Sequence, residues 1–322
     1  MMPLFELIDV THDYGRVRAL RGVSLAVEAG AIGLVGQNGA GKSTLLQILL
    51  GLIRPTQGVA RVLGLDVGTA GVRVRGRVGY MPERGALVPG LRGVEFVALA
   101  GQLSGMPRLQ ALRRAHEVLS YLGLEEARYR YLEQYSVGMK QRLKLAAALV
   151  HDPQVLLLDE PTAGLDPDGR TAMLGVLHAL ARRPNRSLIL SSHLLSDIER
   201  VCQSAVILDC GTVVRTGRIE EFRQAAAKSF RIRCSGDASE LLLSLQRQGV
   251  EIHAADGGNA ARIRLPEQWS TREVFAESLR HNVLITGLEP DEEDFAMAYR
   301  RMLAGERPVG PQAGGRVQRT KP

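Results

Sequence analysis

Apolar and polar positions alternate in blocks along the first two thirds of the chain. The apolar run at residues 31–35 is followed by a glycine-rich stretch and then by a helical pattern at residues 42–50. A second run, residues 155–158, is apolar at every position, which is typical of a parallel strand covered on both faces. Strands that alternate with helices predict an α/β sheet.

Further elements follow from the same pattern. Strands are predicted at residues 4–10, 23–27, 58–63, 77–80, 187–190, 205–208 and 212–215. Helices are predicted at residues 138–150, 167–180 and 194–201, and a helical pattern covers residues 91–121. In that pattern Leu109, Leu112, Ala115, His116 and Leu119 fall on one face.

The pattern changes after about residue 220, which predicts a second, smaller domain. Strands at residues 229–234 and 261–265 and helices at residues 239–247, 271–279 and 292–302 indicate an α+β character. The last residues, 305–322, are rich in Gly, Pro and Arg, which is typical of a disordered segment. We therefore predict a first domain at residues 1–220, a small α+β domain at residues 221–304 and a disordered basic tail.

The composition is that of an ordinary globular protein. Hydrophobic residues make up 45% and charged residues 23% of the 322 positions. No apolar run reaches the roughly 18–20 residues that would span a bilayer, and the first residues lack the pattern of a signal peptide. The three cysteines, Cys202, Cys210 and Cys234, lack metal-type spacing and are interpreted as small buried hydrophobes in a reducing compartment. We expect a cytoplasmic protein.

The charge of the chain narrows its possible partners only a little. The net charge of +7 is compatible with nucleic acid, an anionic membrane surface or anionic nucleotides. The alternating run Arg73, Arg75 and Arg77 is interpreted as the solvated face of a strand, with contact to lipid headgroups as the alternative.

A glycine-rich loop joins the first apolar run to the helix that follows it. The loop fits G-x-x-x-x-G-K-[ST], in which a tightly folded backbone and a helix N-terminus point N–H groups at phosphate oxygens. We expect the lysine to reach the β- and γ-phosphates and the serine hydroxyl to meet Mg²⁺; a turn that binds nothing is the alternative. The predicted nucleotide-binding residues of this loop are Gly36, Asn38, Gly39, Ala40, Gly41, Lys42, Ser43 and Thr44.

Two adjacent carboxylates end the second apolar run. Asp159 is placed to hold Mg²⁺, and Glu160 to act as the general base on an attacking water molecule. A solvated turn after a core strand is the alternative, and the phosphate loop in the same chain favours the catalytic interpretation. The predicted cofactors are therefore ATP and Mg²⁺.

With these motifs the chain resembles the nucleotide-binding domain of ABC transporters over about residues 4–220. The segment Tyr135–Gln141 resembles the signature loop, although Val137 and Met139 depart from the commonest form of the motif. The resemblance implies that two subunits pair head to tail, so that Ser136 and Gly138 of one subunit cover the ATP held by the other. An ordinary helix N-cap by Ser136 is the alternative.

Four more residues take their predicted roles from the same resemblance. Asp166 lies in a segment that resembles the D-loop and would be an interface residue, which is compatible with a helix N-cap. His193 matches the switch histidine that hydrogen-bonds the γ-phosphate. Tyr14 resembles the aromatic residue that stacks on adenine, with an ordinary core or surface tyrosine as the alternative. Glu83 stands where the family has its Q-loop glutamine; a carboxylate can still meet a cation, but it adds negative charge near the γ-phosphate.

The resemblance implies a P-loop NTPase fold of the ABC type, with a helical subdomain at about residues 87–137 that lies against a membrane partner. It implies a subunit that hydrolyses MgATP and drives a separate transmembrane permease from the cytoplasmic face of the membrane. The subunit would act as a homodimer or with a sister ATPase. The form of the signature and the compact C-terminal domain resemble exporter subunits that pair with ABC-2-type permeases.

Two other classes of function stay open. The basic charge is compatible with an ABC-type ATPase that acts on nucleic acid or ribosomes. Chromosome-type relatives insert a long coiled coil and ribosome-associated relatives carry two cassettes, and neither pattern occurs in this sequence, so no nucleic-acid partner is expected. The third possibility is a nucleotide-dependent regulatory module that performs no transport.

Overall fold

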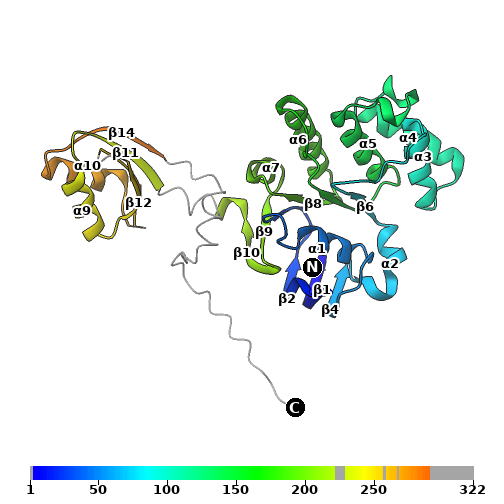
Figure 1. The fold of residues 1–322 in the computed structure, drawn as a ribbon, viewed down its shortest axis with the longest axis horizontal. Helices are drawn as coiled ribbons and strands as arrows, with labels where there is room; N and C mark the ends of the chain where they lie inside the picture. Colours follow the sequence, from blue (N-terminus) through cyan, green and yellow to red (C-terminus); the bar gives the residue numbers. More distant parts are fainter. Residues whose placement is uncertain (1–2, 222–228, 257–258, 267, 291–322) are drawn as a thin grey trace, which may run out of the picture. The chain divides into compact units, whose positions relative to one another are not determined.

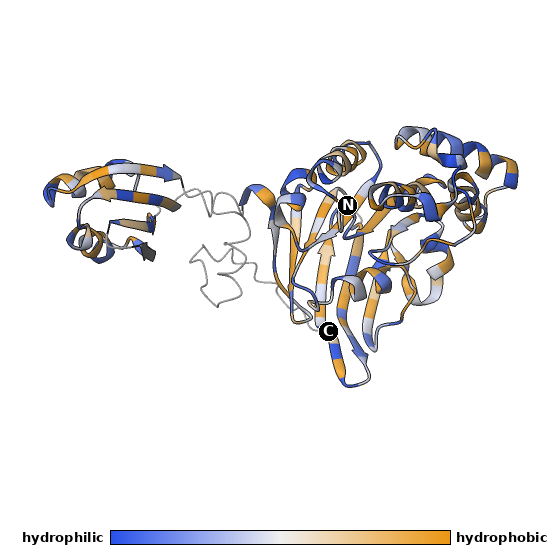
Figure 2. Cartoon of the chain, turned by 45° about the horizontal axis from the view of Figure 1, so that its top comes forward, coloured by the Kyte–Doolittle hydropathy of each residue, from blue (hydrophilic) through white to orange (hydrophobic). Residues whose placement is uncertain are grey.

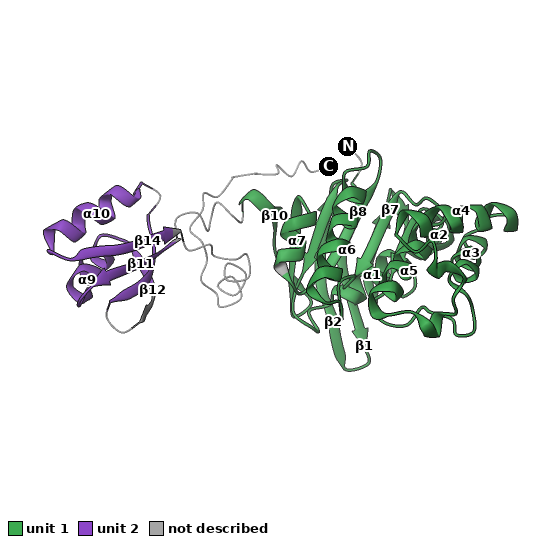
Figure 3. Cartoon of the chain, turned by 90° about the horizontal axis from the view of Figure 1, so that it is seen from above, with its two compact units in different colours: residues 1–222 green, residues 223–322 purple. Residues whose placement is uncertain are grey.

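The computed structural model describes residues 3–221, 229–256, 259–266 and 268–290. The chain divides into two compact units, residues 1–222 and residues 223–322 (Figure 3). The predicted helix at residues 292–302 and the predicted tail at residues 305–322 lie outside the described residues. The two units are taken separately below.

The first unit contains an antiparallel sheet of four strands. Its order is β2 (Val17–Val27), β1 (Phe5–Tyr14), β4 (Gln57–Val62) and β5 (Leu65–Asp66). Strands β1 and β2 form a hairpin that is longer than the predicted strands at residues 4–10 and 23–27. The extension carries mostly polar, exposed residues, so its hydrophobic pattern is weak although its backbone is paired.

A six-stranded sheet forms the centre of the same unit. Its order is β10 (Thr212–Arg218), β9 (Ser204–Asp209), β3 (Ala31–Val35), β8 (Ser187–Ser192), β7 (Val155–Asp159) and β6 (Val78–Met81). The strands from β9 to β6 are parallel, and β10 is antiparallel to β9. Every residue of β3, β7 and β8 is buried, which is why their sequences are so apolar (Figure 2).

Helices cover this sheet and extend one end of the unit. Helix α1 (Lys42–Leu49) shares a single hydrophobic core with strands of both sheets, and α6 (Pro167–Ala181) and α7 (Leu195–Val201) pack on the central sheet. Helices α3 (Gly93–Leu103), α4 (Arg108–Tyr121) and α5 (Val137–Leu149) lie together beside β6 (Figure 1), with two short 3-10 turns, Ala127–Tyr129 and Leu132–Gln134, between α4 and α5. No helix among the described residues is long and apolar enough to cross a membrane.

The helical pattern at residues 91–121 is in fact two helices, and its predicted apolar face is wrong in part. The chain turns at Gly105, whose φ of 92° favours glycine. In α4 the buried residues are Ala111, Ala115, Val118 and Leu119, whereas Leu109 and Leu112 are exposed. Small side chains form this face because α3 and α4 pack closely: a Cβ at Gly101 would lie 3.0 Å from the Cβ of Ala111.

Two more expectations need correction. Arg73 and Arg75 lie on helix α2 (Val67–Arg75) and not on a strand, and the Arg75 guanidinium donates to the carbonyls of Leu50 (3.2 Å) and Gly51 (3.3 Å). Arg75 therefore satisfies carbonyls at the C-terminus of α1, where a positive charge also opposes the helix dipole. Cys202 and Cys234 are buried, but Cys210 is exposed, because it occupies the turn between β9 and β10 with a φ of 45°.

The second unit folds as β11 (Ser229–Ser235), α9 (Ser239–Arg247), β12 (Glu251–Asp256), β13 (Ala260–Arg264), α10 (Thr271–Arg280) and β14 (Leu284–Pro290). Its antiparallel sheet has the order β12-β13-β11-β14, which is the split βαβ arrangement of ferredoxin-like domains. Strands β12 and β14 were not predicted. The unit has its own hydrophobic core, which includes Ile232, Leu241, Leu245 and Ile263.

A buried carboxylate joins the two helices of this unit. Glu277 on α10 accepts a hydrogen bond from the Ser244 hydroxyl on α9 at 2.6 Å, and its other oxygen lies 3.0 Å from the Arg280 guanidinium. These bonds, led by that of Ser244, hold the pKa of Glu277 below its usual value. A lowered pKa means that this stabilisation is present above the ordinary carboxyl pKa and is lost as the pH falls through the pKa of the folded state.

We expect Glu277→Gln to lower the free energy of unfolding of the second unit by about 1.5–3 kcal/mol, the usual contribution of hydrogen bonds to a charged group. Trp269 is the only tryptophan of the chain and packs against this core, so urea denaturation followed by tryptophan fluorescence reports on this unit. Glu240→Gln on the exposed first turn of α9 is the matched control, with an expected loss below about 1 kcal/mol. Equal losses in the two variants would contradict a special role for Glu277.

Candidate active site

Four parallel strands end at one edge of the central sheet, and the residues that follow them form the candidate site. The carboxyl end of β3 leads into the glycine-rich loop, β6 leads to Glu83, β7 ends at Asp159 before Glu160, and β8 is followed by His193. Ligands of open α/β sheets bind at this edge, because the loops after neighbouring strands converge there.

The glycine-rich loop needs its glycines for close packing. A Cβ at Gly36 would lie 2.6 Å from the carbonyl oxygen of Leu208, and a Cβ at Gly41 would lie 2.7 Å from that of Ala19. Gly41 also has a φ of 102° at the start of α1, a conformation that side chains rarely adopt. The loop is thereby wedged between neighbouring backbones with its N–H groups near the first turn of α1.

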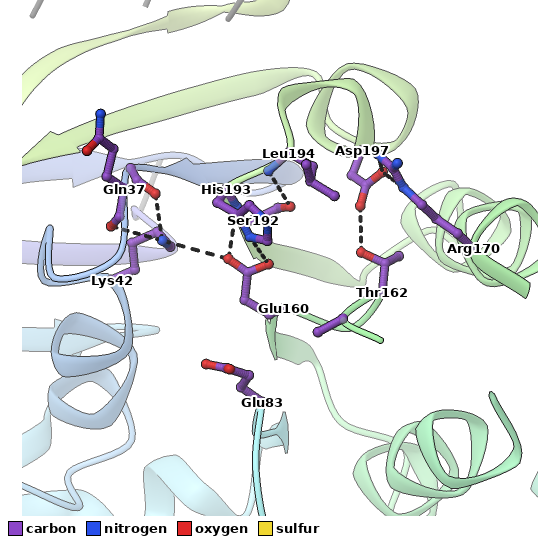
Figure 4. A network of polar contacts seen from close by, with 12 residues as sticks. Gln37, Lys42, Glu83, Glu160, Thr162, Arg170, Ser192, His193, Leu194 and Asp197 are labelled. Carbon is purple, nitrogen blue, oxygen red and sulfur yellow. Dashed lines mark hydrogen bonds and ion pairs between the residues drawn. The ribbon is translucent and has the colours of Figure 1, made fainter. Parts of the chain in front are cut away.

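The lysine of the loop is buried within it. Lys42 is 6% exposed, and its ammonium donates to the carbonyl oxygens of Gly36 at 2.6 Å and Gln37 at 3.3 Å. The ammonium lies 3.7 Å from a carboxylate oxygen of Glu160 (Figure 4). The remaining predicted positions of the loop divide by burial: Ala40 is buried, Thr44 is half-buried, and Asn38, Gly39 and Ser43 are exposed.

The two carboxylates after β7 differ in their surroundings. Asp159 is 3% exposed, and its Oδ1 has no hydrogen-bond partner among the residues that the structure describes. A buried carboxylate oxygen without a donor is costly unless a cation meets it, so Asp159 fits the predicted metal ligand.

Glu160 is held in a fixed orientation by the residue after β8. Its Oε1 accepts a hydrogen bond from the backbone N–H of His193 at 2.9 Å, and its Oε2 lies 2.8 Å from the Nδ1 of His193 (Figure 4). The backbone of Glu160 has a φ of 47°, a strained conformation that is typical of functional positions. Burial raises the pKa of Glu160, and the nearby His193 and Lys42 oppose this shift.

Glu83 lies at the same edge, on the side of β6. Its side chain is directed towards the space between Lys42 and Glu160 (Figure 4), and its carboxylate is 3.2 Å from the Arg84 guanidinium. The carboxylate is partly exposed, so the structure is compatible with its predicted contact to a cation.

The signature segment and the D-loop segment lie next to each other at the starts of two helices. Ser136 caps α5 by accepting from the N–H of Met139 at 3.3 Å, and Asp166 caps α6 by accepting from the N–H of Gly169 at 2.8 Å. Gly138 packs beside Leu165. No contact described above joins Ser136, Gly138 or Asp166 to the group around Lys42, so one chain brings together only part of the predicted site.

Tyr14 ends β1 and lies half-exposed near α1. Its hydroxyl donates to the side-chain oxygen of Gln47 at 3.3 Å, and its ring meets that of His12 edge-on, with 4.6 Å between centroids. One face of an exposed ring is compatible with the predicted stacking on a base.

The sequence did not reveal a buried network behind the site. The Asp197 carboxylate on α7 accepts from the Thr162 hydroxyl at 2.6 Å and from the Arg170 guanidinium on α6 at 2.7 Å (Figure 4). Gln141 on α5 donates to the carbonyl of Ala163 at 2.9 Å. Both interactions fix the segment between Glu160 and α6, and no local pattern marks them, because their partners are far apart in the sequence.

Comparison with known proteins identifies the family. The model of the ABC transporter family matches residues 20–163. The ATP-binding protein YxlF of Bacillus subtilis, an uncharacterised ABC transporter protein, is 32% identical over 304 residues, which cover 93% of this chain and 99% of YxlF. The chain belongs to the family of ABC transporter ATP-binding proteins.

Other members of the family are similar over most of their length. The daunorubicin/doxorubicin resistance ATP-binding protein DrrA of Streptomyces peucetius is 34% identical, over 83% of this chain and 82% of DrrA. The bacitracin transport ATP-binding protein BcrA of Bacillus licheniformis is 30% identical, over 92% of this chain and 96% of BcrA. These names give no support to the alternative of a nucleic-acid or ribosome-associated ATPase.

The fold of the first unit is also that of the family. A dimeric ATP-binding cassette with bound ADP and phosphate is 25% identical and covers 67% of this chain and 98% of that cassette, with a TM-score of 0.62. The predicted P-loop NTPase fold of the ABC type is therefore confirmed.

Proposed function

We propose that this family member binds MgATP at the edge of its central sheet and hydrolyses it to drive transport. The observation that supports hydrolysis best is the position of Glu160, whose carboxylate is held between His193 and the Lys42 ammonium. A carboxylate that is buried, oriented and raised in pKa has the properties of a general base.

The residues present fit a magnesium ion. The Asp159 Oδ1 without a partner among the described residues, the exposed Ser43 at the start of α1 and the Glu83 carboxylate supply oxygen ligands, which Mg²⁺ prefers. When bound, Mg²⁺ supplies positive charge that stabilises the transferring phosphoryl group.

In the proposed reaction the chain positions ATP and a water molecule. The backbone N–H groups of the loop and the Lys42 ammonium bind the β- and γ-phosphates, and Tyr14 stacks on the adenine. Glu160 accepts the proton of the water molecule that attacks the γ-phosphate. His193 holds Glu160 through Nδ1 and has its Nε2 left to hydrogen-bond the γ-phosphate.

We propose a head-to-tail pair of cassettes as the active form. Ser136 and Gly138 at the start of α5 have the chemistry of a phosphate contact, since they combine a hydroxyl with helix N-terminal N–H groups. The dimeric cassette with ADP and phosphate supports such a pair. A homodimer is our default, with a sister ATPase as the alternative partner; Asp166 would lie at the interface.

We further propose that the subunit acts on a separate permease, and in the export direction. The names of DrrA and BcrA, which refer to drug resistance and bacitracin transport, support this. The helices α3–α5 form the surface offered to the permease, which would hold the chain at the cytoplasmic face of the membrane.

Phosphate release from ATP by the purified chain tests the proposal. We expect hydrolysis in the presence of Mg²⁺ and a loss of at least about 100-fold when EDTA removes the ion, because the charge of the phosphates is then left to Lys42 and the backbone alone. EDTA with excess Mg²⁺ is the control. Hydrolysis that is unaffected by EDTA would contradict the metal site, and failure to bind ATP would overturn the proposed function.

A further inference from the structure

The candidate site gathers more negative charge than its phosphate loop balances. The carboxylates of Glu83, Asp159 and Glu160 follow neighbouring strands of the sheet. Lys42 approaches Glu160 from the side of the loop, at 3.7 Å. On the opposite side, a second lysine, Lys144 of α5, reaches the turn that carries Glu83.

Lys144 is bound to the backbone of that turn. Its ammonium donates to the carbonyl oxygen of Pro82 at 3.0 Å and to that of Glu83 at 2.8 Å, and the residue is 7% exposed. Two bonds to adjacent carbonyls restrict the backbone from which the Glu83 side chain projects. The link joins α5, which begins with the signature residues, to the end of β6.

Two carbonyl dipoles are a poor exchange for the water that a buried ammonium loses. Burial accordingly lowers the pKa of Lys144, and the charges of Glu83 and Asp159 oppose this shift. The surroundings that favour the charged form of Lys144 are thus the two carboxylates assigned to the metal. The same attraction acts in reverse, so the lysine offsets the repulsion between Glu83 and Asp159.

We propose that Lys144 is a positioning residue of the nucleotide site, which holds the turn at Pro82 and Glu83 and balances the charges of Glu83 and Asp159. Lys144 touches neither nucleotide nor water in this role and acts through Glu83. The inference rests on the proposed function, because Glu83 matters to catalysis only if MgATP binds at this edge. A lysine that merely fills space under the turn would not depend on the charge of Glu83.

The first test compares Lys144→Met, which keeps the length but removes the charge, with Lys144→Arg, which keeps the charge and the donors. We expect the methionine variant to lose about tenfold or more in kcat with a change below about threefold in KM for ATP, because displaced catalytic groups slow the chemical step. The arginine variant is expected to recover most of the loss. Arg142→Met is the matched control on the same helix, since Arg142 faces Gly123 instead of the site.

The second test asks whether the effect depends on the charge of Glu83. In the Glu83→Gln background the same replacement of Lys144 is expected to cost at least threefold less in kcat than in the wild type, because one of the two charges to be balanced is gone. Equal losses in the two backgrounds, or an arginine variant as slow as the methionine variant, would overturn the proposal.

A third readout requires no hydrolysis. Hydrogen exchange of the amides at residues 83–86, measured without nucleotide, is expected to be at least tenfold faster in Lys144→Met than in the wild type and close to wild type in Lys144→Arg. Unchanged exchange would overturn the positioning role even where ATP is hydrolysed normally. Loss of ATPase activity in the wild type would instead count against the proposed function, and the exchange experiment would still test Lys144.

Discussion

Replacing Glu160 by glutamine is expected to abolish ATP hydrolysis and to leave MgATP binding intact. The loss of a general base costs about 10²–10⁴-fold in rate, and the amide cannot take the proton of the attacking water. The substitution keeps the shape of the side chain, whose oxygen can still accept from the N–H of His193. The variant also removes a negative charge that lies 3.7 Å from Lys42, and this favours bound phosphate.

Two measurements check this result together. Phosphate release should fall by at least about 100-fold, and sedimentation in MgATP should show a stable dimer, because nucleotide held between two copies is no longer consumed. Glu117→Gln, on the exposed surface of α4, is the matched control and should behave as wild type. Normal turnover in Glu160→Gln would exclude Glu160 as the base, and a monomer with bound ATP would contradict the paired arrangement of cassettes.

Replacing Lys42 by alanine is expected to remove both binding and hydrolysis. The ammonium is the only side-chain cation that contacts the glycine-rich loop among the interactions described for the first unit, and its bonds to Gly36 and Gln37 place it inside the loop. Without it, the phosphates would face Glu160 and Asp159 with no adjacent positive side chain. Loss of one such stabilising group costs about 10²–10³-fold in catalysis.

The two variants should separate binding from chemistry. Titration with a fluorescent ATP analogue is expected to show an affinity at least about tenfold weaker for Lys42→Ala and an unchanged or tighter affinity for Glu160→Gln. Arg108→Ala at the exposed start of α4 is a control for the loss of a positive charge. Wild-type affinity in Lys42→Ala would mean that nucleotide binds elsewhere on the chain.

Local sequence was enough for the elements of the central sheet. The uninterrupted apolar runs at residues 31–35 and 155–158 predicted buried parallel strands because a strand covered on both faces must be apolar at every position. The caps Ser136 and Asp166 were also readable, since an N-cap is set by the side chain and the next three residues. The structure brings Lys42, Glu160 and His193 together because their strands are neighbours in one sheet.

Patterns that depend on partners were misread. Arg73 and Arg75 alternate as in a strand, yet the C-terminus of α1 provides carbonyls for Arg75 on a helix. The buried side of α4 is lined by alanines because α3 approaches closely, and spacing alone could not show which side that would be. Leucines at helical spacing looked like the core although solvent covers them.

Residue order alone therefore sufficed for the phosphate loop, the acidic strand end and the family, since each depends on residues that are neighbours along the chain. Contacts between distant segments were settled by folding, among them those of Thr162 with Asp197 and of Lys144 with the turn at Glu83. The physical reason is that a buried polar group must find its partner in space. Packing of the whole sheet and its helices decides which partner is within reach.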